Sequence, residues 1–396
     1  MLWLATLARR NPEDLPWTKL DLAQPVGAFT GRKLVALRQE PQQCRSLLRR
    51  AGVRFNPLPP RAGEQCGYSD AVPTQPSLFE AAGLGRRIRD ERGDVRDAAR
   101  VAQVVAEFRP DFVFHLAAQA IVSTSYADPL NTISTNVMGT AAVMDALRKV
   151  DHPCTAVIVT SDKAYENVEW PWGYRETDRV GGRDIYSGSK GAAEVIFHAY
   201  QQSFFAQSDG PVRVASARAG NVIGGGDWAA DRIVADCVRA WERGGNVEIR
   251  SPQATRPWQH VLEPLSGYLT LAMRLKDNAS LHGESFNLGP KGEQNATVLE
   301  LLEDLARVWG FEDVSKAYRV TGNIPFHEAG LLKLNIDKAL LQLKWEPNLS
   351  YGECVEMTGG WYREVVREGA DADRLTTAQI RAYEAFAEQR RRVWAR

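Results

Sequence analysis

The sequence lacks the features that mark several large classes of protein. Lys plus Arg and Asp plus Glu both number 49, so the formal net charge is zero and no overall field attracts nucleic acid or anionic lipid. No apolar run approaches the ~18 residues of a membrane-spanning helix. Residues 1–7 are apolar but have neither a basic leader nor a small-residue cleavage site. We therefore expect a cytoplasmic protein with no nucleic-acid or membrane partner.

Cysteine pairs are also missing. The five cysteines are scattered and odd in number, and none shows the paired spacing of a zinc site or a disulfide framework. They are Cys44, Cys66, Cys154, Cys237 and Cys354. We expect free thiols and no metal.

Residues 1–66 lack a sustained hydrophobic period and are rich in Arg, Pro and Gln. A segment without a period of 2 or 3.6 does not bury one face of a strand or helix. We expect this atypical segment to be irregular or disordered.

From residue 90 onwards, segments with the pattern of strands alternate with segments with the pattern of helices. Strands are expected at residues 111–115, 155–159 and 211–218, and helices over residues 98–108, 131–150 and 184–205. Residues 297–391 are mostly helical in pattern, with a strand at 333–336. This order predicts an α/β fold, a Rossmann-like doubly wound parallel sheet with a smaller C-terminal substrate-binding lobe. We expect a dinucleotide-binding domain over 67–221, without its first βα unit, and a lobe over 222–396 interleaved with the core.

The chemistry is expected around one strand and the helix that follows it. Residues 155–159 form a β-branched apolar run typical of a strand buried on both faces, and polar residues start abruptly at Thr160. Ligands of open α/β sheets bind beyond the carboxyl ends of the strands, so Thr160, Asp162 and Lys163 are candidate active-site residues. A plain surface salt bridge between Asp162 and Lys163 is the alternative, but it does not suit the buried end of a central strand.

Tyr186 and Lys190 are four residues apart and share one face of a helix. A nearby ammonium favours the phenolate, so Lys190 is expected to lower the pKa of Tyr186 and let it deprotonate an alcohol. This spacing arises about once by chance in a chain of this composition, so its context after the strand carries the prediction.

Two further segments are candidate ligand contacts. Small residues close the strand at 115–119, where they either admit a flat ligand or allow tight packing of a helix on the sheet. Residues 220–226 contain four glycines, which indicates a sharp turn or a close ligand, and Asn221 is the expected hydrogen-bonding residue there. Arg232 and Arg256 follow and would suit a diphosphate if they converge, although each alone could be a solvated surface arginine.

Over residues 67–361, roughly three quarters of the chain, the sequence resembles the extended short-chain dehydrogenase/reductases, a family of NAD-dependent nucleotide-sugar epimerases and dehydratases. The resemblance rests on residues 67–68, 73–80, 93–97, 115–119, 135–140, 160–163, 172–176, 186–190, 218–228 and 256–267. Relatives that act on dTDP-glucose carry Thr-Asp-Glu after the central strand. The order Asp162-Lys163 is instead similar to the branch that acts on CDP-glucose.

The resemblance implies a lyase in which NAD is reduced and regenerated within one turnover of a nucleotide sugar. Tyr186 would take the proton of the C4 hydroxyl, and Lys190 would hold the phenolate and the nicotinamide ribose. Lys163, directly or through a water, would be the base at C5, and Asp162 the acid at the departing C6 hydroxyl. Thr160 would position O4. An adjacent acid and base suit elimination of water.

The resemblance also assigns binding roles. Asp94 and Val95 would contact the adenine, and the wall on the pyrophosphate side would be His115, Leu116, Ala117 and Ala118. Thr135 is a further candidate contact of NAD, and Asn221, Arg232 and Arg256 would hold the diphosphate of the substrate. A homodimer or higher homo-oligomer would form through the helices that hold Asn136 and Tyr186, packed as a four-helix bundle. The pathway would be deoxysugar biosynthesis, such as that of lipopolysaccharide O-antigen.

One part of the family pattern is missing from the sequence. The family opens with a strand and a Gly-rich turn that binds the pyrophosphate of NAD, whereas residues 27–33 offer glycines with the wrong spacing and no strand before them. We expect a miscalled start or an upstream frameshift. Ser123 and Ile185 stand where the family tends to have Arg and Pro. The alternatives are a dehydratase or epimerase for another nucleotide sugar, or a non-catalytic relative that binds nucleotide sugars.

Overall fold

The computed structural model describes residues 33–36, 66–69, 74–206, 210–321 and 330–395. The segment expected to be irregular, residues 1–66, lies outside these residues except for 33–36 and 66. Residues 27–32, the poor match to a Gly-rich turn, lie outside them as well.

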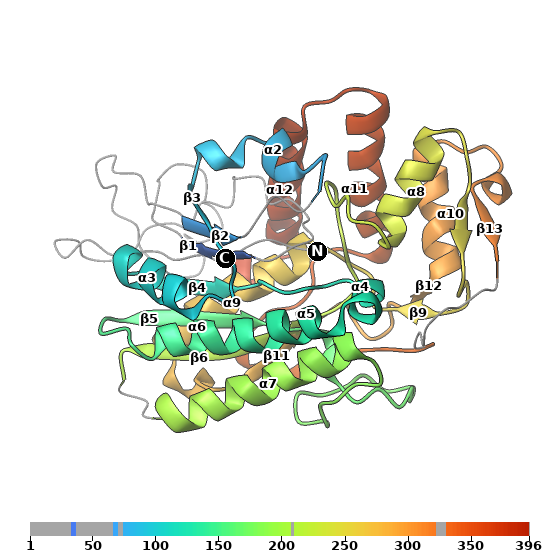
Figure 1. The fold of residues 1–396 in the computed structure, drawn as a ribbon. Coiled ribbons are helices and arrows are strands. Elements are labelled where there is room, and N and C mark those ends of the chain that lie inside the picture. The colour runs from blue at the N-terminus through green and yellow to red at the C-terminus, as the bar shows by residue number, and fades with distance from the viewer. Residues whose placement is uncertain (1–32, 37–65, 70–73, 207–209, 322–329, 396) are drawn as a thin grey trace.

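A seven-stranded sheet is the centre of the molecule (Figure 1). Its strand order is β11-β6-β5-β4-β1-β2-β3. The strands are β1 (Lys33–Ala36), β2 (Cys66–Ser69), β3 (Arg89–Arg92), β4 (Phe112–His115), β5 (Cys154–Val159), β6 (Val212–Ala219) and β11 (Ser285–Leu288). The α/β class and the Rossmann-like arrangement are therefore confirmed.

The sheet is parallel except at β1, which runs antiparallel to both β2 and β4. The remaining neighbours pair in parallel. In a dinucleotide-binding sheet the Gly-rich turn follows the carboxyl end of a central strand, where it meets the other carboxyl ends. Because β1 is reversed, its carboxyl end lies at the edge of the sheet opposite to the carboxyl ends of its neighbours β2 and β4.

Helices cover both faces of this sheet. Those on one face, α3, α6 and α7, lie side by side, and α9 packs on β5 and β6 from the other face (Figure 1). The helices are α2 (Leu78–Ala81), α3 (Ala98–Phe108), α4 (Val122–Ala127), α5 (Pro129–Ile133), α6 (Gly139–Leu147), α7 (Ile185–Phe204), α8 (Ile233–Glu242), α9 (Leu262–Asp277), α10 (Val298–Trp309), α11 (Tyr351–Tyr362) and α12 (Ala372–Gln389). Within the described ranges, no helix is both long and apolar enough to cross a membrane.

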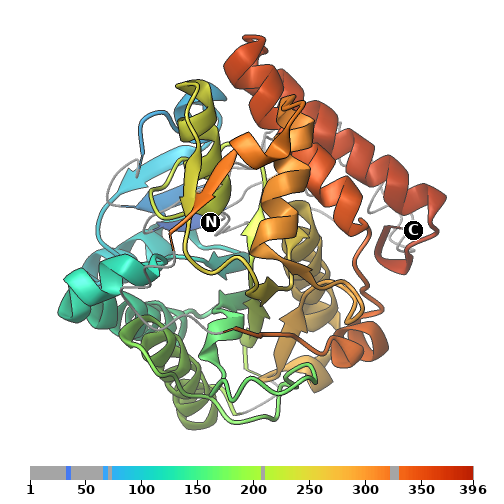
Figure 2. The same ribbon diagram turned by 90° about the vertical axis from the view of Figure 1, so that its right-hand side faces the viewer.

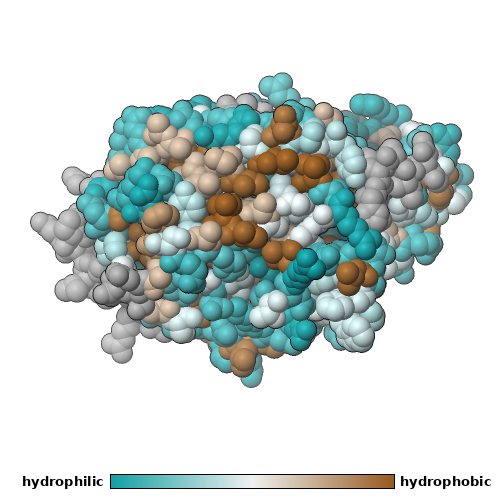
Figure 3. Space-filling view, turned by 60° about the horizontal axis from the view of Figure 1, so that its bottom comes forward, coloured by the Kyte–Doolittle hydropathy of each residue, from teal (hydrophilic) through white to brown (hydrophobic). Residues whose placement is uncertain are grey.

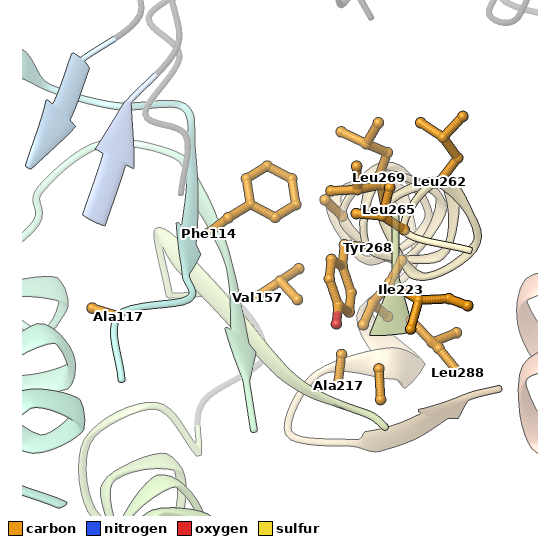
Figure 4. Packing of buried hydrophobic residues seen from close by; sticks show 14 of the residues in the cluster. Phe114, Ala117, Val157, Ala217, Ile223, Leu262, Leu265, Tyr268, Leu269 and Leu288 are labelled. Carbon is orange, nitrogen blue, oxygen red and sulfur yellow. The ribbon is translucent and has the colours of Figure 1, made fainter. Parts of the chain in front are cut away.

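The core between the sheet and α9 consists of close apolar contacts. Figure 4 shows Leu265 and Tyr268 of α9 facing Val157 of β5 and Phe114 of β4. Val157 has no exposed surface, and the residues on either side of it are equally buried. Burial of both faces of β5 explains its unbroken apolar run.

The C-terminal part of the chain carries three small sheets beside the main one (Figure 2). They pair β7 (Val222–Ile223) with β10 (Gln259–His260), β8 (Val247–Ile249) with β13 (Tyr318–Val320), and β9 (Thr255–Arg256) with β12 (Ala296–Thr297). α9 and β11 return to the seven-stranded sheet, so residues beyond 222 contribute to the core as well as to the smaller lobe.

Two sequence-based boundaries need correction. The strand expected at residues 333–336 is absent, and Leu334 forms only an isolated bridge with Tyr174. The side chain of Leu334 packs instead in a small cluster with Tyr165 and Tyr174, which needs no strand pairing. The helix expected at 131–150 runs from Pro129 to Leu147 and contains a wider π-turn at Ser134–Met138.

Within the described residues there are four free, buried cysteines, Cys66, Cys154, Cys237 and Cys354. Cys44 lies outside these residues. No group of three or more His, Cys, Asp or Glu in the described part of the chain is arranged to hold a metal ion.

Candidate active site

The carboxyl ends of β5 and β6 open into a cavity of about 290 Å³. Many of the predicted site residues line it, and they come from six separate segments of the chain. These residues are Leu116, Thr160, Asp162, Lys163, Tyr186, Lys190, Asn221, Arg232 and Arg256. The structure thus brings the tyrosine of α7 and the acid and base candidates after β5 into one cavity.

Asp162 lies in a single helical turn that begins after β5. Ser161 caps this turn, donates from its hydroxyl to Asp162 Oδ1 at 2.9 Å, and accepts from the backbone N–H of Lys163. Asp162 Oδ2 is buried without a hydrogen-bond partner among the described residues. Burial raises the pKa of the Asp162 carboxyl, and the charge of Lys163 opposes this only in part. A raised pKa makes a carboxyl better suited to general acid catalysis.

The missing side chain of Gly220 leaves room for the buried carboxyl of Asp162. A Cβ added at Gly220 would lie 1.8 Å from Asp162 Oδ2, far inside van der Waals contact. The glycine-rich loop after β6 therefore approaches the acid candidate with its bare backbone, which is a close-approach reason for glycine. The alternative of a surface salt bridge between Asp162 and Lys163 is wrong, since Asp162 is 1% exposed.

Tyr186 lies in the first turn of α7, which begins after the cap residue Asp184. The Asp184 carboxylate accepts from the N–H of Ser187 at 2.9 Å, so the helix starts at Ile185 and orients Tyr186 towards the cavity. Burial raises the pKa of Tyr186 to about 12. The charge of Arg232 and a hydrogen bond with Ser161 act in the opposite direction.

The expectation that Lys190 lowers the pKa of Tyr186 is wrong for the protein by itself. Burial outweighs the nearby cations, and Arg232 is the cation with the largest effect on the phenol. Lys190 is itself buried, which lowers its pKa to about 8, while the carboxylate of Glu194 acts to raise it. Sharing a helix face brought Tyr186 and Lys190 into the same cavity but did not determine their electrostatic partners.

The hydroxyl of Thr160 forms a hydrogen bond within the protein. It donates to Glu194 Oε1, a fully buried carboxylate of α7. Because a hydroxyl has one proton and two lone pairs, Thr160 can offer a ligand only an acceptor in this arrangement.

Both arginine candidates are anchored at the cavity and are not solvated surface residues. Arg256 is 4% exposed and donates to the backbone carbonyl of Thr255. Its positive charge acts to lower the pKa of Asp162. Arg232 precedes α8 and donates to the carbonyl of Ala120 at 2.9 Å, across the cavity from its own segment. Asn221 has a positive φ of 49°, and its Oδ1 is buried without a partner among the described residues.

The candidates for cofactor contact are divided between two places. Leu116, Tyr186 and Lys190 line the cavity, whereas Asp94, Val95, His115, Ala117, Ala118 and Thr135 are not among its lining residues. Val95 is buried against Gly139. Both carboxylate oxygens of Asp94 accept from the side chain of Arg96, so this carboxylate already has an ionic partner.

Two buried polar atoms fit a dinucleotide at the end of β4. Thr140 donates to the carbonyl of Asn136, so His115 Nε2 must donate to the Thr140 hydroxyl at 3.1 Å. Burial and the charge of Lys190 lower the pKa of His115 to about 3, which leaves Nδ1 as an acceptor. Neither this Nδ1 nor the Thr135 hydroxyl has a partner among the described residues. An acceptor suits a ribose hydroxyl better than a phosphate oxygen.

Asn136 holds this region together. Its side chain accepts from the N–H of Gln119 at 2.7 Å and donates to the carbonyl of the same residue and to the hydroxyl of Ser189. The loop after β4 is thereby attached to α7. Of this loop, Leu116 and Ala120 line the cavity.

The sequence analysis gave no individual role to four residues of the site. Ser161, part of the polar run 160–163 that follows the strand, contacts both Asp162 and Tyr186. Glu194 lies one helical turn beyond Lys190, which was a usable signal. Tyr268 of α9 and Gly220 reach Asp162 through the tertiary fold, and nothing in the local sequence of Tyr268 indicates this.

Comparison with known proteins gives a consistent result. A model of the GDP-mannose 4,6-dehydratase family matches residues 78–358. A CDP-glucose 4,6-dehydratase from Salmonella typhimurium is 43% identical over 304 residues, which is 76% of this chain and 84% of that protein. A CDP-paratose 2-epimerase from Salmonella typhi is 24% identical and covers 68% of this chain and 82% of its own.

Solved structures share the fold at lower identity. A dTDP-glucose 4,6-dehydratase from Streptomyces venezuelae, a double mutant solved with NAD, has a TM-score of 0.62 at 22% identity, covering 72% of this chain and 83% of that chain. A UDP-glucose 4-epimerase from Thermotoga maritima has a TM-score of 0.60 at 22% identity, covering 71% of this chain and 86% of that chain.

Proposed function

The chain belongs to the GDP-mannose 4,6-dehydratase family, and from that premise we propose that it is a lyase that converts CDP-glucose to CDP-4-keto-6-deoxyglucose with NAD as cofactor. The relative at 43% identity supports CDP-glucose as the substrate. The observation that carries the proposal is the buried Asp162 carboxyl beside Lys163, in the same cavity as Tyr186. An acid, a base and a phenol around one hexose are the groups that this elimination needs.

Each residue has a distinct role in this proposal. Tyr186 takes the proton of the C4 hydroxyl, and the ketone then formed at C4 acidifies the hydrogen at C5. Lys163 removes that hydrogen, directly or through a water, while Asp162 gives its proton to the C6 hydroxyl, which leaves as water. Burial raises the pKa of Asp162, which favours the protonated form that this step needs.

NAD, when bound, would accept hydride from C4 and return it at C6. His115, Thr135 and Leu116 would line its place at the end of β4, and Lys190 would hold the ribose hydroxyls through its ammonium. The unpartnered buried atoms of His115 and Thr135 support this assignment, as do the places of Leu116 and Lys190 in the lining of the cavity. Asp94 and Val95 remain the proposed contacts of the adenine.

Arg232, Arg256 and Asn221 are proposed to bind the diphosphate of the substrate. Guanidinium groups pair with phosphate oxygens in a bidentate manner, and both arginines reach the cavity from the side of the smaller lobe. Arg232 already donates to the carbonyl of Ala120, and this hydrogen bond holds its guanidinium at the cavity.

The four buried free thiols are typical of a reducing compartment, and we place the reaction in the cytoplasm.

Incubation of the purified protein with CDP-glucose and NAD tests this function. We expect a 4-keto-6-deoxy sugar, detected by its absorbance in alkali, and dinucleotide released when the protein is denatured. An epimer as the product would show an epimerase of the same family. Protein that contains dinucleotide but leaves CDP-glucose, dTDP-glucose and GDP-mannose unchanged would contradict catalysis.

We also propose a homodimer formed through α5 and α7. Exposed apolar side chains gather on the face of the molecule where these helices lie (Figure 3). They are Leu130 and Ile133 of α5, Met138 of the π-turn, and Ile185 and Val195 of α7. Such a patch on two neighbouring helices suits a symmetric partner, with the two pairs of helices forming a four-helix bundle.

Leu130→Glu is expected to weaken this dimer about 100-fold, because each copy would bury an unpaired carboxylate at the interface. Leu130 is 77% exposed in the single chain, so the substitution should leave folding intact. Molar mass by light scattering over a concentration series measures the effect. Leu341→Glu is the matched control, since Leu341 is 69% exposed but lies in the separate turn Ala339–Leu343. A dimer unaffected by Leu130→Glu would place the interface elsewhere.

A further inference from the structure

Glu194 is a buried carboxylate for which neither the sequence nor the proposed reaction has yet provided a role. It lies on α7 with no exposed surface. Arg218 of β6 donates to Glu194 Oε2 at 2.9 Å, and Ser216 and Ser285 donate to the same oxygen at 3.0 and 3.4 Å. A buried carboxylate with one guanidinium and several hydroxyl donors is stable as an anion.

The other oxygen of Glu194 points to the active site. Glu194 Oε1 accepts from the hydroxyl of Thr160 at the carboxyl end of β5. Glu194 also lies one helical turn after Lys190, and its charge acts on the Lys190 ammonium. One carboxylate therefore acts on two cavity residues that come from different elements of the fold.

We propose that Glu194 is a positioning residue for dehydration: it fixes the hydroxyl of Thr160 as a hydrogen-bond acceptor for the sugar and keeps Lys190 charged. The proposal rests on the function proposed above. Glu194 is not among the residues that line the cavity, so it acts through Thr160 and Lys190.

The charges around Glu194 favour the anionic form that this role requires. Burial raises the pKa of Glu194, but the charge and hydrogen bond of Arg218 and the hydrogen bond of Thr160 outweigh it, so the pKa lies below its usual value. His198, one turn further along α7, faces the same carboxylate at 3.9 Å. These contacts favour the anionic form of Glu194.

Lys190 depends on that anion. Its burial lowers its pKa to about 8, and Glu194 counters part of this effect. His115 of β4, on which the charge of Lys190 acts, is neutral above pH ~3 and supplies no negative charge. Tyr186, one turn earlier on α7, has a pKa of about 12 and is also uncharged near neutral pH. Removing the charge of Glu194 should therefore lower the pKa of Lys190 further, so that the ammonium is lost at a lower pH.

Two substitutions separate the two effects. Glu194→Gln removes the charge, and we expect the alkaline limb of the kcat profile to move down by about one pH unit. Glu194→Asp keeps the charge but draws the carboxylate back from Thr160. We expect kcat to fall about tenfold, with the alkaline limb in place and KM for CDP-glucose little changed.

A direct titration of Lys190 makes the test independent of turnover. With ¹³C-labelled lysine, the Lys190 resonance should titrate near pH 8 in the wild-type protein and about one unit lower in Glu194→Gln. Inactive wild-type protein would reject the proposed function, while this titration would still report on Glu194. If Glu194→Gln does not fold because Arg218 loses its partner, Glu194→Asp alone decides the question.

Ser285→Ala is the matched control. Ser285 donates to Glu194 Oε2 but contacts no proposed catalytic residue, so its loss should leave kcat and the pH profile unchanged. Wild-type kcat in Glu194→Asp, or an unmoved Lys190 titration in Glu194→Gln, would overturn the positioning role.

Discussion

Replacing Tyr186 with phenylalanine is expected to lower turnover of CDP-glucose by about 10²–10⁴-fold, the range that one positioned acid or base contributes. The substitution removes only the hydroxyl, which is the proposed acceptor of the C4 proton. Phenylalanine fills the same buried volume, so the fold should be kept. The substitution should stop oxidation at C4, the first chemical step, so neither reduced dinucleotide nor a 4-keto sugar should form.

Tyr186 can take the C4 proton only if its raised pKa is lowered in the complex. A phenol with a pKa of about 12 is almost entirely protonated at neutral pH. Lowering that value to ~7 requires roughly 7 kcal/mol of differential stabilisation, at about 1.36 kcal/mol per pKa unit. That value already includes the charge of Arg232 and the hydrogen bond with Ser161. The lowering must therefore come from the bound cofactor and substrate, and kcat is expected to rise with pH until the phenol is ionised in the complex.

Tyr383→Phe is the matched control for Tyr186→Phe. Tyr383 is also a buried tyrosine, and its hydroxyl donates to Glu263 at 2.9 Å, in the packing between α9 and α12. Its loss should reduce stability and leave kcat near the wild-type value. Equal activity of Tyr186→Phe and the wild-type protein would remove the proposed role of the phenol.

Asp162→Asn is expected to stop the reaction one step later. The amide has the size of the carboxyl but no acidic proton to give to the C6 hydroxyl, so elimination of water should slow by about 10²–10⁴-fold. Oxidation at C4 should persist, because it depends on Tyr186. A single turnover should then show the absorbance of reduced dinucleotide without a 4-keto-6-deoxy product.

Lys163→Ala distinguishes the base from the acid. It should also oxidise C4 and stall before water leaves. In deuterated water, Asp162→Asn should still exchange the hydrogen at C5, because Lys163 remains, whereas Lys163→Ala should not. Exchange in both variants would show that another group removes this hydrogen.

Local sequence was sufficient for the elements that present the site. The strand expected at 155–159 is β5, which begins one residue earlier. The helix expected over 184–205 is α7, which is one residue shorter at each end. Buried strands and well-capped helices depend mainly on their own side chains, so their patterns survive in any compatible fold. The places of Asp162, Lys163 and Tyr186 in one cavity followed from the rule that ligands bind beyond the carboxyl ends of parallel strands.

Contacts between distant segments could not be inferred in this way. The reversal of β1 depends on its pairing with β2 and β4, and the short Lys33–Ala36 segment carries no sign of direction. Arg232, 46 residues after Tyr186 in the sequence, is the cation that acts most on its phenol. The position of Asp162 depends on the missing side chain of Gly220.

The sequence by itself thus determined which residues could be acid, base and phenol, and the strand and helix on which they lie. Only the tertiary structure decided their pKa values and hydrogen-bond partners. It buried Tyr186, placed the Thr160 hydroxyl in a hydrogen bond with Glu194, and lowered the pKa of Lys190 to about 8. The reason is physical. Secondary structure reflects interactions over a few residues, whereas pKa values depend on desolvation and on charges that the fold brings together from distant parts of the chain.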